Sequence, residues 1–347
     1  RLGRNDPTYL CCRLTNVGLD DAWGQNLARV MKHNNRLETL LLNMNELSDD
    51  CIALMCRTIE THPKLRQLSL GGNDIGDAAA WSLGILLQRN EVLETLNVSG
   101  KKRPKKLRRF RRYAQRISHQ GVEALANGLV GNKVLISLNL SHQDVGDDGA
   151  NALAVALTTN STLNFLNLKD ALITHNGAFA LAYLFTENRG LKTAVLSHND
   201  LGDDGGLAVR NSLRSTRHLQ FVEMDHCNLS ERACGSLLRV LQSSRRLISV
   251  TLHSNHPGEF AHDHAGEAEA RGEGLAMLLH EEKAPTTTAN DTLDGGGTVI
   301  STLSGGVYKG PQQPVAAAGG GGDRSETATF DGGGTLDENG SLDDGGG

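Results

Sequence analysis

Four histidines stand at spacings that place them in one row of a repeated structure. His142, His198 and His226 recur at multiples of a single repeat length, and His253 falls one position short of the next multiple. Imidazole groups can bind a metal ion or take up a proton near neutral pH. Carboxylates that could join in either reaction lie nearby, at Asp170, Glu223 and Asp225.

Three interpretations of this histidine row are open: a metal site, a pH-sensitive polar rim that contacts a partner, and a row of solvated side chains. The metal site is the weakest, because its ligands would come from separate repeats roughly 5 to 10 Å apart and no residues that would orient metal-bound imidazoles are visible. The pH-sensitive rim is stronger, and the solvated row is stronger still. We therefore expect no bound metal and no cofactor.

The sequence has none of the common catalytic motifs. It has no nucleophile elbow, phosphate-binding loop or dinucleotide fingerprint, and His280-Glu281-Glu282 lacks the second histidine of a zinc-protease helix. We expect no catalytic residues and a protein that is not an enzyme.

The elements that must position these side chains belong to a 28-residue repeat. Apolar residues recur at offsets 0, 3, 5 and 10 from a first residue, and then with helical spacing at offsets 15, 18, 19 and 22. The first set predicts a short strand and the second a helix. Neither element can bury its apolar face alone, so neighbouring repeats must stack. The repeats start at Tyr9, Leu37, Leu65, Leu93, Leu135, Leu163, Leu191, Leu219 and Leu247, with one longer gap between Leu93 and Leu135.

The repeat has the pattern L-x-x-L-x-L-x-x-N/C-x-L, and it resembles the ribonuclease-inhibitor type of leucine-rich repeat. Asn45, Asn73 and Asn199 occupy the asparagine position of that pattern, and Cys227 occupies its cysteine alternative. Helix segments such as residues 149–157 are similar to those of GTPase-activating proteins for Ran and of NLR repeat domains. The resemblance covers residues 9 to about 255.

This resemblance implies an α/β fold, a leucine-rich repeat solenoid of about nine repeats with parallel inner strands and outer helices. Strands stack about 4.8 Å apart and helices about 8 to 10 Å apart, so we expect the array to curve into a horseshoe. Gln143 and Ala171 depart from the asparagine position. This leaves the hydrogen bonding of those two turns open.

The concave face of the horseshoe is predicted to carry the residues at offsets 2, 4, 6 and 7. Phe165 and Phe221 stand at offset 2, where an aromatic side chain either anchors a partner or packs against Thr193 and its neighbours. Our candidate partner-binding residues on this face are Asn97, Asn139, His142, Phe165, Asn167, His198, Phe221, Glu223, Asp225, His226 and His253.

A basic insert, residues 101–116, fills the longer gap and lies in the loop between a strand and its helix. It holds ten Lys or Arg residues and no acid. It could be a nuclear import signal, a contact for a polyanion such as RNA or a tubulin tail, or a solvated loop without a partner. The basic residues singled out are Lys101, Lys102, Arg103, Lys105, Lys106, Arg108, Arg109, Arg111 and Arg112.

We expect three segments: the solenoid over residues 1–255 with its insert, a degenerate C-terminal cap over 256–283, and a disordered Gly/Asp/Thr-rich acidic tail over 284–347. Residues 256–347 hold 16 acids and four bases. The chain enters its first repeat at Tyr9 with no room for a capping element, so we expect that it is a piece of a longer protein.

Five of the six cysteines fall at interior positions and only Cys11 should face outward, which favours a reducing compartment. The sequence has no signal peptide and no 18-residue apolar run, so we expect no membrane contact and an intracellular location: cytoplasmic, nuclear or cytoskeletal.

The sequence thus favours a non-enzymatic scaffold or adaptor that holds a protein partner on its concave face, with the insert as a localisation or polyanion-contact element. One alternative, implied by the resemblance, is a GTPase activator of the Ran-activator type. Another is a cytoskeletal, axonemal or RNA-contacting protein that acts through the insert. The partner classes are a small GTPase or a cytoskeletal component for the face, and an importin or polyanion for the insert.

Overall fold

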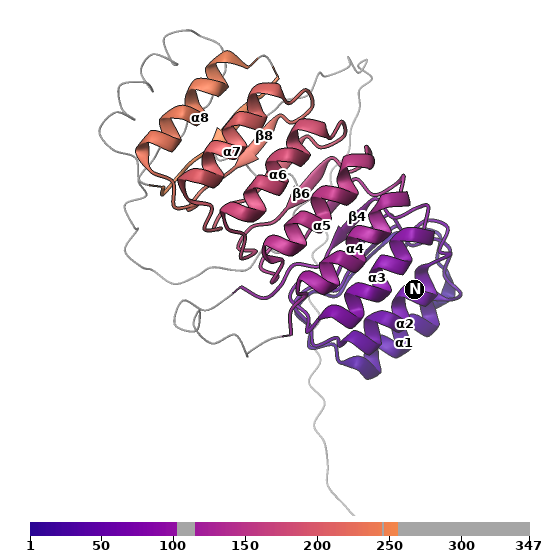
Figure 1. Cartoon of the computed structure of the whole chain (residues 1–347). Coiled ribbons are helices and arrows are strands. Elements are labelled where there is room, and N and C mark those ends of the chain that lie inside the picture. Colours follow the sequence, from indigo (N-terminus) through magenta and orange to yellow (C-terminus); the bar gives the residue numbers. More distant parts are fainter. Residues whose placement is uncertain (103–114, 245, 256–347) are drawn as a thin grey trace, which may run out of the picture. The chain divides into compact units, whose positions relative to one another are not determined.

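The computed structural model describes residues 1–102, 115–244 and 246–255 (Figure 1). The chain divides into two compact units, Arg1–Asp291 and Thr292–Gly347. The predicted cap, the predicted acidic tail and residues 103–114 of the insert lie outside the described residues. All that follows concerns the first unit.

The strands of this unit form one nine-stranded parallel sheet in sequence order. Each strand pairs with the next at equivalent offsets, and the insert does not shift this register, since Asn97 pairs with Asn139. The strands are β1 (Cys11–Arg13), β2 (Thr39–Leu41), β3 (Gln67–Ser69), β4 (Thr95–Asn97), β5 (Ser137–Asn139), β6 (Phe165–Asn167), β7 (Thr193–Val195), β8 (Phe221–Glu223) and β9 (Ser249–Thr251).

A helix follows each strand from β1 to β8, and together the helices form one layer against one face of the sheet (Figure 1). They are α1 (Asp21–Met31), α2 (Asp49–Ile59), α3 (Asp77–Arg89), α4 (His119–Gly131), α5 (Gly146–Thr159), α6 (His175–Glu187), α7 (Gly202–Ser215) and α8 (Glu231–Ser243), after a short 3₁₀ turn at Leu2–Arg4.

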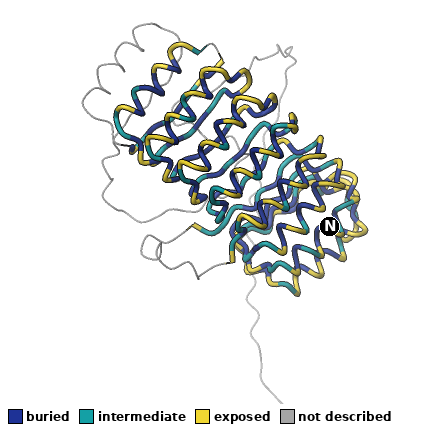
Figure 2. The backbone as a smooth tube through the Cα atoms, viewed as in Figure 1, coloured by how far each residue is buried: buried dark blue, intermediate teal, exposed yellow. Residues whose placement is uncertain are grey.

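The core lies between the two layers. In the fifth repeat, Leu138 of β5 and Leu153 and Leu157 of α5 are buried, as the apolar offsets predict. Figure 2 shows the same alternation along the other helices, with buried positions on one side and exposed positions on the other. These findings confirm the predicted α/β leucine-rich repeat solenoid. The face of the sheet that points away from the helices is called the open face below.

The asparagine position after each strand ties neighbouring repeats together. The Oδ1 atom of Asn199 accepts hydrogen bonds from the N–H groups of Ala171 and Ile173 in the preceding repeat, at 3.0 and 3.1 Å. Its Nδ2 atom donates to the carbonyl oxygens of Leu168 and Leu196. Asn255 makes the same contacts with the repeat before it, although the sequence analysis did not single it out.

The two departures from the asparagine position have different outcomes. Gln143 performs the same task with a longer side chain, because its Oε1 accepts from the Ile117 N–H at 3.0 Å and its Nε2 donates to the Val98 oxygen at 2.6 Å. Ala171 has no polar side chain, but its own N–H is satisfied by Asn199 of the next repeat.

A second row of polar side chains, which the sequence analysis missed, follows the helices. In Asn90 the Oδ1 atom accepts from the N–H groups of Val92 and Leu93, and the Nδ2 atom donates to the carbonyl oxygens of Ile59 and Glu60 in the preceding repeat. The described members of the row are the buried Asn34, His62, Asn90, Asn132, Asn160, Asn188 and Thr216 and the partly buried Ser244.

Carboxylates at the helix starts link neighbouring repeats. The carboxylate of Asp147, at the start of α5, accepts from the N–H of Thr174 at 2.8 Å and from its hydroxyl at 2.6 Å, at the start of α6. Asp77 binds Ser118 in the same way, and Asp203 binds Ser230. In the first repeats the links are consecutive, because Asp21 binds Ser48 in the same way and Asp49 accepts from the Gly76 N–H at 2.7 Å. From α3 onward they alternate, because α4 and α6 begin with His119 and His175.

The cysteine prediction agrees with the structure. Cys11 is exposed, and the other five cysteines are buried and unpaired. Burial raises the pKa of the Cys56 and Cys227 thiols to about 12, so these groups stay protonated core side chains. In the described part of the chain, no helix combines the length and the apolarity needed to cross a bilayer.

Candidate partner-binding surface on the open face of the sheet

The two candidate phenylalanines stand on the open face with one strand between them. Phe165 of β6, Thr193 of β7 and Phe221 of β8 are in register, and all three are half-exposed. Two strand spacings separate the phenylalanine backbones by roughly 10 Å. No ring contact joins Phe165 and Phe221 among the aromatic contacts of the described residues.

Two residues further along these strands lies a second row of side chains on the open face, and its outer members are polar. Asn167, Val195, Glu223 and Thr251 are in register, and Val195 is buried while Glu223 is half-buried. Burial, and then the nearby Asp225 carboxylate, raise the pKa of Glu223, while Lys169 and His253 act in the opposite direction. The surface therefore holds a partly desolvated carboxylate.

The asparagine column turns out to have a structural task. The Oδ1 atoms of Asn97, Asn139 and Asn167 each accept a hydrogen bond from the N–H two residues later, at 2.9 to 3.0 Å. Asn97 also donates to the Ser69 hydroxyl at 3.0 Å. These side chains close the ends of their strands. A partner on this face would meet side chains whose carbonyl groups are already engaged.

The histidine row follows the strands at the rim of the open face. His142, His198 and His226 have left-handed backbones, with φ of 62°, 64° and 55°. The rings of His198 and His226 stack with centroids 4.2 Å apart. His142 Nδ1 lies 3.0 Å from the Asp170 carboxylate.

The last histidine of the row is paired in a similar way, since His253 Nδ1 lies 3.2 Å from the Asp225 carboxylate. The row is thus divided into separate pairs. Within the described residues, no three His, Cys, Asp or Glu side chains come together as metal ligands.

The two ends of the basic insert are fixed at its base. The guanidinium group of Arg116 donates to the carbonyl oxygens of Lys101 and His142, and it lies 3.9 Å from the Asp144 carboxylate. A Cβ atom on Gly100 would collide with the His142 carbonyl oxygen, so this position must be glycine.

Of the basic residues singled out, only Lys101 and Lys102 are among the described residues. Lys101 Nζ pairs with the Asp74 carboxylate at 2.8 Å, while Lys102 is exposed. Lys101 therefore helps to hold the base of the insert as well as adding to its charge.

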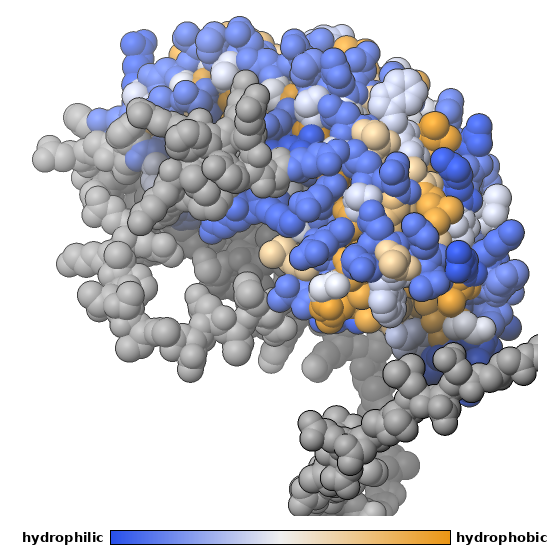
Figure 3. All heavy atoms as spheres, turned by 90° about the horizontal axis from the view of Figure 1, so that it is seen from below, coloured by the Kyte–Doolittle hydropathy of each residue, from blue (hydrophilic) through white to orange (hydrophobic). Residues whose placement is uncertain are grey.

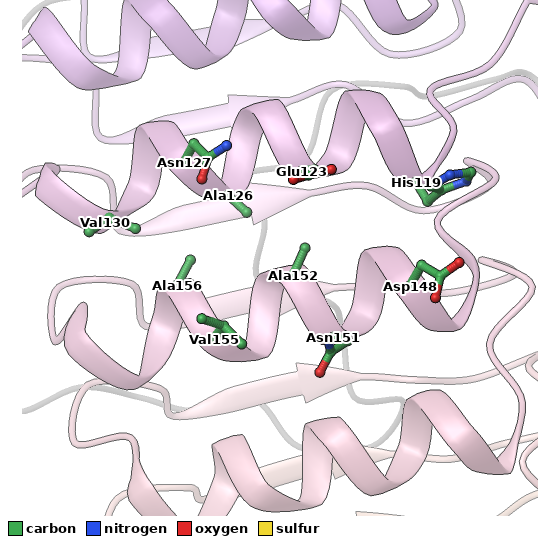
Figure 4. A pocket seen from close by; sticks show the side chains of 10 residues that line it. All are labelled: His119, Glu123, Ala126, Asn127, Val130, Asp148, Asn151, Ala152, Val155 and Ala156. Atoms are coloured by element: carbon green, nitrogen blue, oxygen red, sulfur yellow. The ribbon is translucent and has the colours of Figure 1, made fainter.

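The outer face of the helix layer offers two other features. A groove of about 360 Å³ runs between α4 and α5, with His119 and Asp148 at one end and Val130 at the other (Figure 4). It arises where the small side chains Ala126 and Ala152 face each other. On α6, Phe179 and Tyr183 are exposed to 51% and 62%. In the view of Figure 3, hydrophobic groups are interspersed with polar side chains.

Comparisons with known proteins agree with the fold. The family model described as "Leucine Rich repeat" matches residues 61–83, 131–154 and 188–209. The human "NACHT, LRR and PYD domains-containing protein 12" is 38% identical over 90 residues, which are 25% of this chain and 8% of that protein. The human "NACHT, LRR and PYD domains-containing protein 13" is 28% identical over 99 residues, 28% of this chain and 10% of that protein.

The matched part thus spans a tenth or less of the length of these relatives. Among solved structures, "Leiomodin-1 Actin-Binding Site 2 (ABS2)" is 17% identical, covers 48% of this chain and 73% of that chain, and has a TM-score of 0.32. A TM-score this low gives no reason to expect that the two proteins bind the same partner.

Proposed function

Because the chain is a leucine-rich repeat protein, we propose that it is a non-enzymatic scaffold or adaptor and that the open face of its sheet binds a protein partner. The observation that carries this proposal is the pair of half-exposed phenylalanines, Phe165 and Phe221, on the face that the helices leave uncovered. Aromatic side chains in such places commonly supply much of the binding energy of an interface.

The site is also built on a rigid support. The strands that carry Phe165 and Phe221 are held in register on both sides, and Asn199 links the turns of the repeats between them. Rigid elements lower the entropy that binding costs, because little of the surface must be ordered on contact. This suits a repeat protein that presents a preformed face to another protein.

The test is affinity purification with mass spectrometry on the full chain and two double variants. Phe165→Ala/Phe221→Ala alters the open face, and Phe179→Ala/Tyr183→Ala removes two exposed aromatics from the outer face of α6. We expect a defined set of proteins to be lost with the first variant and kept with the second. An identical set with all three proteins would contradict the proposal.

We propose as well that the basic insert contributes localisation or polyanion contact, supported by its ten Lys or Arg residues and by its fixed base. The informative variant replaces Lys105, Lys106, Arg108, Arg109, Arg111 and Arg112 with alanine and keeps Lys101 and Arg116, which hold the base.

If the insert contacts a polyanion, the affinity for RNA or for tubulin-tail peptides should fall and its salt dependence should become shallower. If it is an import signal, nuclear accumulation of a fluorescent fusion should fall. A variant that leaves all of these measurements unchanged would identify a loop without a partner.

A further inference from the structure

The surface over β7 is low, and larger side chains stand on both sides of it. Thr193 and Val195 point to the open face from β7, and Val195 is buried to 4% exposure. Phe165 flanks them on β6, and Phe221 and Glu223 flank them on β8. Val195 is already covered by its neighbours, so an incoming side chain could rest on β7 only over the partly exposed Thr193, between the two aromatic side chains.

The charged end of this area lacks a hydrogen-bond donor. Glu223 is half-buried, and no hydrogen bond or ion pair to its carboxylate is seen within the described residues. The Glu223 carboxylate is not among the buried, unsatisfied side-chain groups of the described residues, so a ligand can reach it, and a charge-assisted hydrogen bond to it would add affinity.

The local charges favour a cation as that donor. Asp225 adds a second carboxylate beside Glu223, although it already accepts hydrogen bonds from the backbone N–H and the ring of His253. Lys169 is the nearby cation, and it makes no ion pair within 4.0 Å of Glu223 among the described contacts. An acidic ligand would be repelled here, and an apolar one would leave Glu223 unpaired.

The aromatic pair favours the same ligand. The backbones of Phe165 and Phe221 lie roughly 10 Å apart, which leaves the width of one extended side chain between them over β7. Lysine and arginine also have long apolar stems that pack on aromatic rings while the charged group reaches a polar partner.

We propose that the partner presents a lysine or arginine whose stem lies over β7 between Phe165 and Phe221 and whose charged group binds Glu223. This inference rests on the proposed function, and it names the chemistry of the partner at the same surface.

The test pans a library of random dodecapeptides, displayed on phage, against the full chain and against three variants. Glu223→Gln removes the charge, Glu223→Arg reverses it, and Phe165→Ala/Phe221→Ala removes the aromatic pair. We expect one position of the selected peptides to be lysine or arginine with the unaltered chain, to lose that preference with Glu223→Gln, and to favour Asp or Glu with Glu223→Arg. A synthetic copy of a selected peptide should bind Glu223→Gln about tenfold more weakly.

The outcomes separate the two proposals. Peptides that need Phe165 and Phe221 but show no basic preference, or that bind Glu223→Gln as well as the unaltered chain, would overturn this inference and leave the scaffold proposal intact. If no selected peptide depends on Phe165 and Phe221, both proposals fail together. If basic peptides are selected only after deletion of residues 103–114, the site belongs to the chain's own insert and not to a partner.

Discussion

Arg116 donates a hydrogen bond from its guanidinium group to the carbonyl oxygen of Lys101 at 2.8 Å, across 15 residues of sequence. The same guanidinium also reaches the carbonyl oxygen of His142 in the next repeat. One side chain therefore closes the basic insert at its base and joins that base to the following turn.

Replacing Arg116 by alanine should destabilise the solenoid by about 2 kcal/mol, because hydrogen bonds from a charged donor to two carbonyl groups are lost. The measurement is urea unfolding followed by circular dichroism. Lys102→Ala is the matched control, since Lys102 is an exposed base at the same end of the insert, and it should change stability by less than about 0.5 kcal/mol. Equal effects of the two substitutions would contradict the assigned role of Arg116.

Gln143→Ala should cost about 2 to 4 kcal/mol of unfolding free energy, because it leaves two buried backbone groups unsatisfied. These groups are the Ile117 N–H and the Val98 carbonyl, which Gln143 now serves. Gln88→Ala on the exposed side of α3 is the control and should be nearly neutral. A Gln143→Ala protein as stable as the control would show that water replaces the side chain at no cost.

The stability of the chain should depend on pH through His62. Burial lowers the pKa of this imidazole below its ordinary value of 6.5. The folded state therefore favours the neutral ring. Its stability is fully present above pH 6.5 and falls as the pH drops from there through the folded-state pKa.

His62→Asn tests this origin of the pH dependence. Asparagine is the residue found at most other positions of the same row, and at Asn90 it accepts from the same two backbone N–H positions that His62 serves through Nδ1. The variant should fold and should have a flatter stability profile below pH 6.5 in urea titrations. An unchanged profile would assign the pH dependence to another group.

The phenylalanines of the open face should contribute little to stability. Phe165→Ala or Phe221→Ala should cost about 1 to 2 kcal/mol, less than a core phenylalanine, because both side chains keep part of their surface exposed. Phe185→Ala on α6, which has 2% exposure, should cost about 3 to 5 kcal/mol. Thermal unfolding of the three variants checks this, and a large loss for Phe165→Ala would identify a core residue.

Much of the fold could be predicted from the sequence because each repeat carries the same apolar offsets. Leu135, Leu138 and Leu140 are buried at the places their spacing indicates, and β5 lies between the first and the last of them. The asparagine rows were harder. Asn255 stands at the same offset as Asn199 and could have been found by extending the pattern to the last repeat. The row containing Asn90 also recurs with the repeat, but its partners are backbone groups of the preceding repeat.

The candidate surface could be predicted only in outline. The alternation of a strand places Phe165 and Phe221 on one face, but spacing does not reveal that Asn139 is engaged by the Ser141 N–H. The stacking of His198 on His226 depends on a left-handed backbone that recurs at the same offset of most repeats, including Met44 and Asp170, but the residue types at this offset vary too much to reveal it from the sequence. The role of Arg116 depends on a contact with a turn in the following repeat.

From α3 to α8 the links between helix starts recur at every second repeat, whereas α1 to α4 are linked consecutively. The Asp147 carboxylate accepts a hydrogen bond from Thr174, and the Asp203 carboxylate accepts one from Ser230. Helix α6, which lies between α5 and α7, begins with His175. If the single repeat that contains Asp147 were deleted, α4 and α6 would become neighbours. Neither of them begins with an aspartate, so Thr174 would lose the carboxylate that accepts its hydrogen bonds. If two consecutive repeats were deleted, a helix start with an aspartate would again be followed by a helix start with a serine or threonine that can donate to it. Between α3 and α8, the module that could be duplicated, deleted or exchanged without leaving an unmatched junction is therefore a pair of repeats.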